Sequence, residues 1–391
     1  MTDISFYFEA LKPELTKKRY TLDQSKLRDY TDFHLEGDYP NWRKADVVIL
    51  GCNEDRGARE GQGAGLAPDA VREHLYHLVV PKAGMKIADL GNLKKMEDLS
   101  LYYDALSQVV EEVVKLGKLL IILGGSQDIV YGQYKGYQRI STNVEYVHID
   151  STLDVEDSDF GVNNKSINHK IFLHSPNFLF NFTNLGYQSY FVSPSDKKRL
   201  QNLYFHALRV GELKNKIHLA EPYLRNANLV SVDMAAVRSA DAPGTSHPSP
   251  AGFSSDEICQ LMRFAGMSNR VSSLSLTELQ PERDTNEQAV LLGALMLWYF
   301  IEGYYNRRPD EPSEQLDSLT KYTVSIHNGA QEISFYHNTQ SDRWWMEVPY
   351  SDDLGKKEGR SELIPCSPAD YESAKEDEIP ERWWQAHHKL R

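Results

Sequence analysis

The chain has 391 residues, of which 41% are hydrophobic, and a formal net charge of −13. This length and composition are sufficient for one large α/β core, with or without an appended segment. The acidic charge and the lack of a basic aromatic patch argue against nucleic acid and anionic membrane surfaces as partners, and no apolar run reaches the roughly 18 residues of a membrane-spanning helix.

The start of the chain and its cysteines indicate a reducing compartment. Residues 1–7 lack a positively charged leader followed by an apolar stretch, so we expect no secretory signal. The three cysteines, Cys52, Cys259 and Cys366, are far apart and odd in number, which favours buried free thiols over disulfides. The sequence therefore predicts a cytoplasmic protein with no direct membrane insertion.

The first half of the chain alternates short apolar runs with segments of helical pattern. It predicts strands at 47–51, 87–90, 119–123 and 144–149, helices at 68–78 and 102–116, and a glycine-rich, charged loop at 54–65. Continuous apolar strands alternating with helices are typical of a parallel sheet that is covered on both faces. The predicted fold class is α/β, a three-layer α/β/α sandwich around a mostly parallel sheet.

The second half of the predicted core continues this alternation. It predicts a long polar loop at 156–168, strands at 186–192 and 229–232, and helices at 254–264 and 287–304. Ser254 or Ser255 could cap the first of these helices. The second helix is apolar on more than one face, so we expect it to be deeply packed or to lie at a subunit contact.

Residues 306–391 are predicted to be a Trp-rich extension of the α/β domain at 1–305. The stretch 307–312 is typical of a linker. Strands are expected at 322–326 and 332–336. Two similar segments, 341–345 and 380–384, each end in a Trp-Trp pair. These tryptophans either dock the extension onto its own core or form a partner surface, since Trp and Arg are enriched where binding energy concentrates.

Polar side chains follow three of the predicted core strands. Gln127 follows the strand at 119–123, Asp150 and Asp154 follow the strand at 144–149, and Asp233 comes directly after the strand at 229–232. Because the carboxyl ends of parallel strands meet at one edge, these residues are expected in one crevice, where carboxylates could share a hard cation. The alternative is that Asp154 belongs, with residues 157–159, to a solvated acidic loop and that Asp233 caps a helix or a turn.

The motifs around these residues resemble those of the ureohydrolase superfamily, which contains arginase, agmatinase and formimidoylglutamase. They are Gly124-Gly125-Ser126-Gln127, Asp150-Ser151-Thr152-Leu153-Asp154, Ser231-Val232-Asp233-Met234-Ala235, Asp241-Ala242-Pro243-Gly244 and Leu274-Ser275-Leu276-Thr277-Glu278. The resemblance runs from about Val47 to about Tyr305. The C-terminal extension resembles that of formimidoylglutamase-like proteins of Bacteroidetes-type bacteria.

The resemblance implies a manganese pair held by two histidines and four aspartates, and half of these ligands are replaced in this chain. Gln127 and Thr152 stand at the histidine positions, and Ala235 stands at the last aspartate position. One ion would meet Gln127, Asp150, Asp154 and Asp233, whereas the other would keep only the shared Asp150 and Asp233. We therefore expect no cofactor, or at most one divalent cation, Mn, Mg or Ca. The resemblance also places Glu278 where it would bind a cationic nitrogen of a substrate.

Neighbouring side chains are not expected to replace the lost ligands. His148 shares a strand face with Asp150, but neither His148 nor His169, His174 and His247 has the spacing of a ligand pair on one element. Without a cation the aspartates repel one another. One of them would then take up a proton or recruit a basic residue, for which Arg56, Arg59 and Arg238 are the candidates.

These losses lead to two functional hypotheses. The preferred one is a catalytically degenerate ureohydrolase-fold protein, a pseudoenzyme with no catalytic residue, that acts as a binding or assembly component through a protein partner or self-association. Losing one metal should cost at least the roughly 10²–10³ in rate that one stabilising donor supplies, so little amidine hydrolysis is expected. The alternative is a formimidoylglutamase-type amidine hydrolase that uses a single residual metal.

Overall fold

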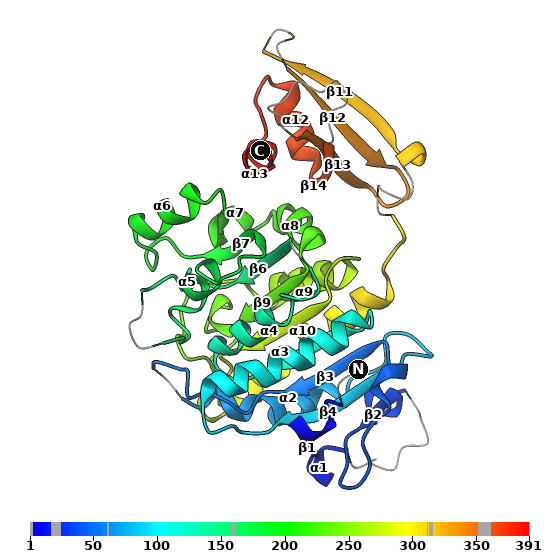
Figure 1. Ribbon diagram of the computed structural model, residues 1–391, viewed down its shortest axis with the longest axis vertical. Helices are drawn as coiled ribbons and strands as arrows, with labels where there is room; N and C mark the ends of the chain where they lie inside the picture. The colour runs from blue at the N-terminus through cyan, green and yellow to red at the C-terminus, as the bar shows by residue number, and fades with distance from the viewer. Residues whose placement is uncertain are drawn as a thin grey trace.

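The computed structural model describes residues 3–16, 25–60, 62–141, 143–157, 161–310, 312, 316–327, 329, 331–350 and 361–390. A ten-stranded sheet forms the main body, and a separate four-stranded sheet lies beyond it at the C-terminal end (Figure 1). Part of the predicted acidic loop, residues 158–160, lies outside the described residues, as does residue 311 of the predicted linker.

The main sheet is almost entirely parallel. Its strands are β1 (Phe8–Glu9), β2 (Thr31–Phe33), β3 (Val47–Gly51), β4 (Ile87–Leu93), β5 (Leu119–Leu123), β6 (Val144–Ile149), β7 (Leu179–Tyr187), β8 (His206–Arg209), β9 (Leu229–Asp233) and β10 (Ser273–Thr277). The order is β1-β4-β3-β5-β10-β9-β6-β7-β8, with β2 also paired to β4. The β1–β4 pair is antiparallel and the other described pairs of this sheet are parallel. The predicted mostly parallel sheet is confirmed.

Helices cover both faces of this sheet. They are α1 (Pro13–Thr16), α2 (Ala67–Leu75), α3 (Leu99–Lys115), α4 (Val130–Lys135), α5 (Ile167–Phe172), α6 (Pro194–Asn202), α7 (Val210–Leu213), α8 (Glu221–Asn226), α9 (Ser255–Met267) and α10 (Gln288–Tyr305). Because strand side chains alternate, Val47 and Ile49 join the core beneath α2, α9 and α10, whereas Val48 and Leu50 join the core beneath α3 and α4. The predicted three-layer sandwich is confirmed.

One predicted strand of the core is wrong in its position. The strand expected at 186–192 is β7, which ends at Tyr187, and the residues after it form turns. Tyr190 and Phe191 suggest a strand by composition, but their side chains are 66% and 53% exposed because they lie beyond the edge of the sheet. The predicted cap of α9 is confirmed, since Ser254 Oγ accepts a hydrogen bond of 3.3 Å from the Glu257 amide.

Helix α10 is packed on several sides, as its all-round apolar pattern predicts. It lies against both α9 and α2. The contact with α9 depends on Gly266, where an added Cβ would lie 2.1 Å from the carbonyl oxygen of Phe300. The three cysteines are buried and free, as expected. No helix within the described ranges is long and apolar enough to cross a bilayer.

The extension forms a second sheet with two helices. Its elements are β11 (Thr320–Ile326), β12 (Gln331–Asn338), β13 (Arg343–Pro349), β14 (Ser361–Cys366), α12 (Pro368–Lys375) and α13 (Glu381–Lys389). The strands pair antiparallel in the order β11-β12-β13-β14, so the two strands expected from the sequence are confirmed. This sheet has its own apolar core, which includes Phe335, Met346 and Trp383. That 306–391 is a separate domain stays a prediction.

The extension docks on α8 through a buried arginine. Arg225 Nη2 donates hydrogen bonds of 3.0 Å to the carbonyl oxygens of Trp344 and Cys366, and its guanidinium lies 4.7 Å from the centre of the Trp345 ring. Trp345 and Trp383 are only 3% and 5% exposed. The tryptophans therefore pack largely within the protein, and Trp384, at 44% exposure, is the member of the two pairs that still presents a large open face.

We predict that Arg225→Met loosens the extension. The change removes the charged donor that Arg225 supplies to two carbonyl oxygens and leaves its buried surroundings unfilled, so we expect the free energy of unfolding to fall by about 2–4 kcal/mol and the extension to be cleaved faster in limited proteolysis. Arg209→Met is the matched control, because Arg209 is exposed and, among the residues that the structure describes, forms its ion pair with Glu212 on the surface. A change below about 0.5 kcal/mol is expected there. Equal stability of the two variants in a chemical denaturation series would contradict the docking role.

We also predict that Gly266→Ala forces α9 and α10 apart. A methyl group would collide with the backbone of Phe300, so we expect a loss of about 2–3 kcal/mol in the free energy of unfolding. Gly211→Ala in α7 serves as the comparison, since an added Cβ there meets nothing within 4 Å. That variant should be neutral or up to about 1 kcal/mol more stable, and thermal unfolding distinguishes the two outcomes.

Candidate functional site

The carboxyl ends of four neighbouring strands deliver the polar residues predicted from the sequence to one crevice. The strands β5, β10, β9 and β6 lie side by side in that order. The residues that follow or end them are Gln127 and the four crevice carboxylates Glu278, Asp233, Asp150 and Asp154, with exposures of 0%, 1%, 8%, 1% and 6%. The solvated-loop alternative for Asp154 is therefore wrong, and burial makes the charge of every carboxylate in this group costly.

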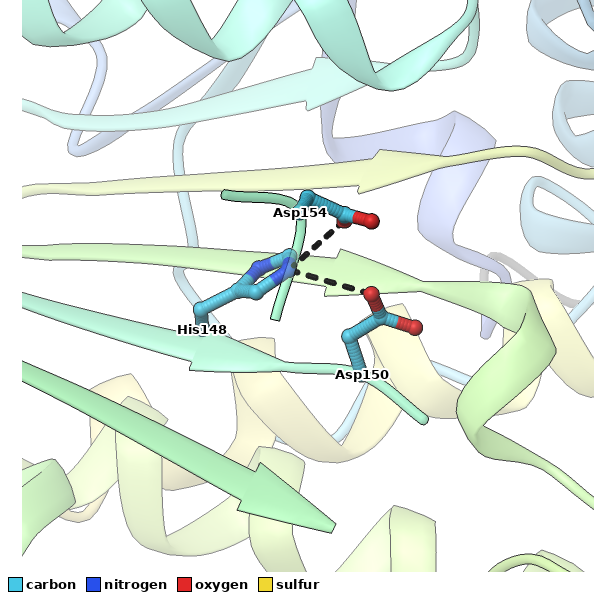
Figure 2. Close-up of side chains that lie close together, drawn as sticks. All are labelled: His148, Asp150 and Asp154. Atoms are coloured by element: carbon cyan, nitrogen blue, oxygen red, sulfur yellow. Dashed lines mark ion pairs between the residues drawn. The ribbon is translucent and has the colours of Figure 1, made fainter. Parts of the chain in front are cut away.

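His148 lies between two of these carboxylates. Its Nε2 is 3.3 Å from Asp150 Oδ2 and 3.5 Å from Asp154 Oδ2 (Figure 2), while its Nδ1 is 2.7 Å from Ser231 Oγ. Burial alone lowers the pKa of His148, but hydrogen bonds and attraction from the two aspartates outweigh burial and raise this pKa to about 9. The shared strand face of His148 and Asp150 that the sequence predicts is confirmed, whereas the expectation that His148 does not replace a lost metal ligand stays a prediction.

Gln127, which the resemblance places at the first histidine position, lies against Asp154 and His148. Its Nε2 donates a hydrogen bond of 2.7 Å to Asp154 Oδ2 and lies 2.9 Å from His148 Nε2. Its other amide atom, Oε1, is buried and accepts no hydrogen bond from the residues that the structure describes. A buried carbonyl oxygen without a donor is unfavourable, and a cation could satisfy it.

Thr152, at the second histidine position, bridges two aspartates. Its Oγ1 is 2.8 Å from Asp150 Oδ2 and 2.7 Å from Asp154 Oδ1. A hydroxyl has one hydrogen, so Thr152 donates a hydrogen bond to one carboxylate only. Its short contact with the other aspartate requires a proton on that aspartate. Burial and the charge of Asp150 raise the pKa of Asp154 to about 6, whereas His148 overcomes the effect of burial and lowers the pKa of Asp150 to about 2. Because the pKa of Asp154 is the higher of the two, Asp154 is the aspartate that carries this proton.

Asp233 is both a turn cap and a member of the crevice, so the two interpretations of this residue are compatible. Its Oδ1 accepts a hydrogen bond of 2.6 Å from the backbone N–H of Ala235. Burial, followed by repulsion from Asp150 and Glu278, raises the pKa of Asp233 well above its usual range. The methyl side chain of Ala235 offers no ligand at the position where the family pattern has an aspartate.

Glu278 joins three segments of the crevice. Its carboxylate accepts hydrogen bonds from the backbone N–H of Gln127 at 2.8 Å, from Ser246 Oγ at 2.7 Å and from Asn164 Nδ2 at 3.3 Å. Its backbone φ is 62°, in the left-handed region that costs an ordinary side chain free energy. In this structure Glu278 therefore orders the surrounding loops, and its role toward a substrate stays a prediction.

The arginines suggested as neutralising partners are all engaged elsewhere. Arg56 pairs with Glu54, Arg59 with Glu156, and Arg238 with Asp241. They are therefore the wrong candidates, because each satisfies a carboxylate close to it on its own loop or at the rim of the crevice.

Lys165 is the basic residue that the four crevice carboxylates attract. Burial lowers its pKa, but attraction to these carboxylates, Asp154 foremost, outweighs this effect, and the pKa lies above its usual value. Sequence reasoning missed this residue. The available signal was that Lys165 is the only lysine or arginine in the polar stretch 156–168.

A cavity of about 460 Å³ opens beside the carboxylates. Thr152, Asp154, Lys165, Phe191 and His247 are among the side chains that line it. The volume falls in the range of small-molecule sites, and the lining combines charged groups with one exposed aromatic ring.

The residues present fit one metal ion. Donor atoms of His148, Asp150 and Asp154 lie within 4.8 Å of one another. Metal–ligand bonds of about 2.0–2.2 Å place neighbouring donors roughly 3.0–3.6 Å apart. The distances from His148 Nε2 to Asp150 Oδ2 and Asp154 Oδ2, 3.3 Å and 3.5 Å, lie in this range. A second ion does not fit in the same way, because Ala235 offers no donor and Thr152 offers only a neutral hydroxyl.

Comparison with known sequences identifies formimidoylglutamases as relatives. The chain is 26% identical over 285 residues to the formimidoylglutamase of Corynebacterium efficiens, which covers 68% of this chain and 87% of that protein. It is 22% identical over 266 residues to the formimidoylglutamase of Legionella pneumophila strain Paris, covering 64% of this chain and 83% of the relative.

Solved structures show the same fold. The Trypanosoma cruzi formiminoglutamase with Mn²⁺₂ superposes with a TM-score of 0.64 at 22% identity, over 69% of this chain and 100% of that one. The Bacillus subtilis formimidoylglutamase superposes with a TM-score of 0.67 at 17% identity, over 76% of this chain and 97% of that one. Residues 45–302 match the model of the arginase family, well over half of the chain. The protein therefore belongs to the arginase family and has formimidoylglutamases among its homologues.

Proposed function

We propose that this protein is a formimidoylglutamase-type amidine hydrolase that works with one divalent cation instead of two. The observation that carries the proposal concerns the side-chain amide of Gln127. Its Oε1 is buried and accepts no hydrogen bond from the described residues, while its Nε2 lies against His148 and Asp154. Rotation of that amide would turn the oxygen toward the same cluster, where a cation held by His148, Asp150 and Asp154 would satisfy it. The names of the relatives agree with this activity.

The chain's own groups would organise the reaction around that cation. Ser231 orients the His148 ring through Nδ1, and Thr152 holds the carboxylates of Asp150 and Asp154 in a fixed spacing. The adjoining cavity, which Asp154 also lines, would accept the substrate beside the cation. A bound divalent cation would lower the pKa of its water and polarise the amidine carbon.

The rate expected from this arrangement is low. Paired-metal hydrolases place two ions about 3.5–4 Å apart and use both to stabilise the developing charge. This chain keeps the donors of one ion. The missing half of the electrostatic stabilisation should cost at least about 10²–10³ in rate relative to a two-ion enzyme.

A second candidate function is a binding or assembly component without turnover. Thr152 and Ala235 favour it, because they remove two ligands from one ion site while the crevice stays intact. The extension adds a possible contact surface around the exposed Trp384. Such a protein would recognise a partner chain, or a second copy of itself, without releasing product.

Metal content and product release separate the two candidates. After dialysis against Mn²⁺, we expect one ion per chain and slow formamide release from formimidoylglutamate, both lost in Asp154→Asn. Asp196→Asn is the control, since Asp196 lines the same cavity but accepts its hydrogen bond from Ser193; it should keep the ion. Uptake of no manganese and no formamide release would leave the second candidate. Two ions per chain with fast turnover would overturn both the one-ion proposal and the second candidate.

A further inference from the structure

The strand β11 is an edge of the second sheet. The order β11-β12-β13-β14 leaves β11 paired with β12 alone among the described strands. The opposite edge strand, β14, lies against α8 of the main body (Figure 1). An edge strand presents a row of backbone N–H and C=O groups that can pair with another strand. Within the described part of the chain, one edge of this sheet is therefore covered by the main body and the other is open.

β11 lacks the features that usually protect such an edge. It pairs with β12 over the seven consecutive residues Thr320–Ile326 without a bulge, and it contains no proline. Natural proteins use short edge strands, bulges, prolines and edge charges to prevent edge-to-edge pairing. A regular edge strand of this length is suited to accept a further strand.

The one charged residue of β11 is turned away from the edge. Lys321 Nζ lies 3.8 Å from Glu347 Oε2 on β13 and 5.3 Å from the centre of the Tyr336 ring on β12. Both partners belong to interior strands, so the ammonium lies across the sheet and not beyond its edge. A lysine at an edge normally repels an incoming strand, and this position reduces that repulsion.

The inner face of β11 is incompletely covered. Tyr322 stacks on the Trp344 ring at 5.4 Å, and Val324 packs against the same apolar core, yet both side chains remain partly exposed. Thr323 and Ser325 alternate with them and are exposed on the outer face. A strand added beside β11 would cover Tyr322 and Val324 if it presented apolar side chains on their face of the sheet.

We propose that β11 is a dimerisation edge, at which β11 of a second copy of this chain pairs antiparallel and continues the sheet across both copies. Full overlap of the two strands places the two-fold axis at Thr323. In that register Tyr322 lies opposite the second copy's Val324, and Lys321 lies opposite the second copy's Ser325.

This register makes the strand complementary to itself, which selects a second copy as its partner. An aromatic side chain opposite a β-branched one is a favourable cross-strand pair, and no two like charges oppose each other. One strand pair buries less area than the roughly 1,200–2,000 Å² of a standard interface, so we expect a concentration-dependent dimer with a micromolar Kd. The pairing uses no crevice residue, so this inference does not depend on the proposed function.

The first experiment changes the charge at Ser325, which faces the second copy's Lys321 in the dimer. Ser325→Lys places two ammonium groups opposite each other twice in each dimer, whereas Ser325→Glu creates two opposite-charge pairs. Sedimentation equilibrium of the full chain should show Ser325→Lys associating at least about tenfold more weakly than Ser325→Glu, with the unmodified protein between them. Should Ser325→Lys not fold, tighter association of Ser325→Glu than of the unmodified protein decides the question.

The direction of this effect separates the register from a general effect of charge. Two chains of net charge −13 repel each other, so an added lysine alone would favour association and an added glutamate would weaken it. Thr285→Lys and Thr285→Glu are the matched controls, because Thr285 is exposed on the main body. They should follow this general trend or leave association unchanged. Ser325 variants that follow the same order as the Thr285 variants overturn the proposal.

The second experiment locates the contact by hydrogen exchange of the full chain at low and high concentration. Exchange in residues 320–326 should slow as the mass doubles, because amides on the open side of β11 gain hydrogen bonds. Ser325→Lys should lose this protection at the same concentration. A mass that does not rise between about 1 µM and several hundred µM overturns the proposal. Dimerisation without slower exchange at 320–326, or slower exchange there in a monomer that has bound a foreign peptide, also overturns it.

Discussion

The repulsion among four buried carboxyl groups is the constraint that organises this crevice. Asp150, Asp154, Asp233 and Glu278 lie at one edge of the sheet with almost no exposure to water. Water cannot screen their charges there, so neighbouring groups must supply protons or positive charge. The polar contacts of the crevice supply some of these protons and charges. In the Trypanosoma cruzi formiminoglutamase structure, which has the same fold, Mn²⁺₂ is present.

The backbone around the crevice is held by packing that does not involve a metal. Gly124 and Gly125 have φ values of 74° and 79° and turn the chain sharply after β5. A side chain at Gly125 would place its Cβ 2.7 Å from the carbonyl oxygen of Glu54. This close approach fixes the start of the segment that carries Gln127.

The sequence predicted the sheet and the crevice because both depend on local patterns. Apolar runs marked β5, β6 and β9, and the polar residues after them marked the shared edge. The role of Lys165 was not predictable in this way, since it depends on how a polar loop folds back over Asp154. The turn after β7 was misread for a related reason, because the composition of Tyr190 and Phe191 does not reveal that the sheet ends before them.

The docked extension has a consequence for protein synthesis. Arg225 donates a hydrogen bond to the carbonyl oxygen of Cys366, 141 residues later in the chain. Lys389 donates one to the side chain of Asn181, 208 residues earlier. Contacts this distant in sequence form only after the last helix has left the ribosome. A chain that stops short would leave a buried arginine and its apolar surroundings open to water.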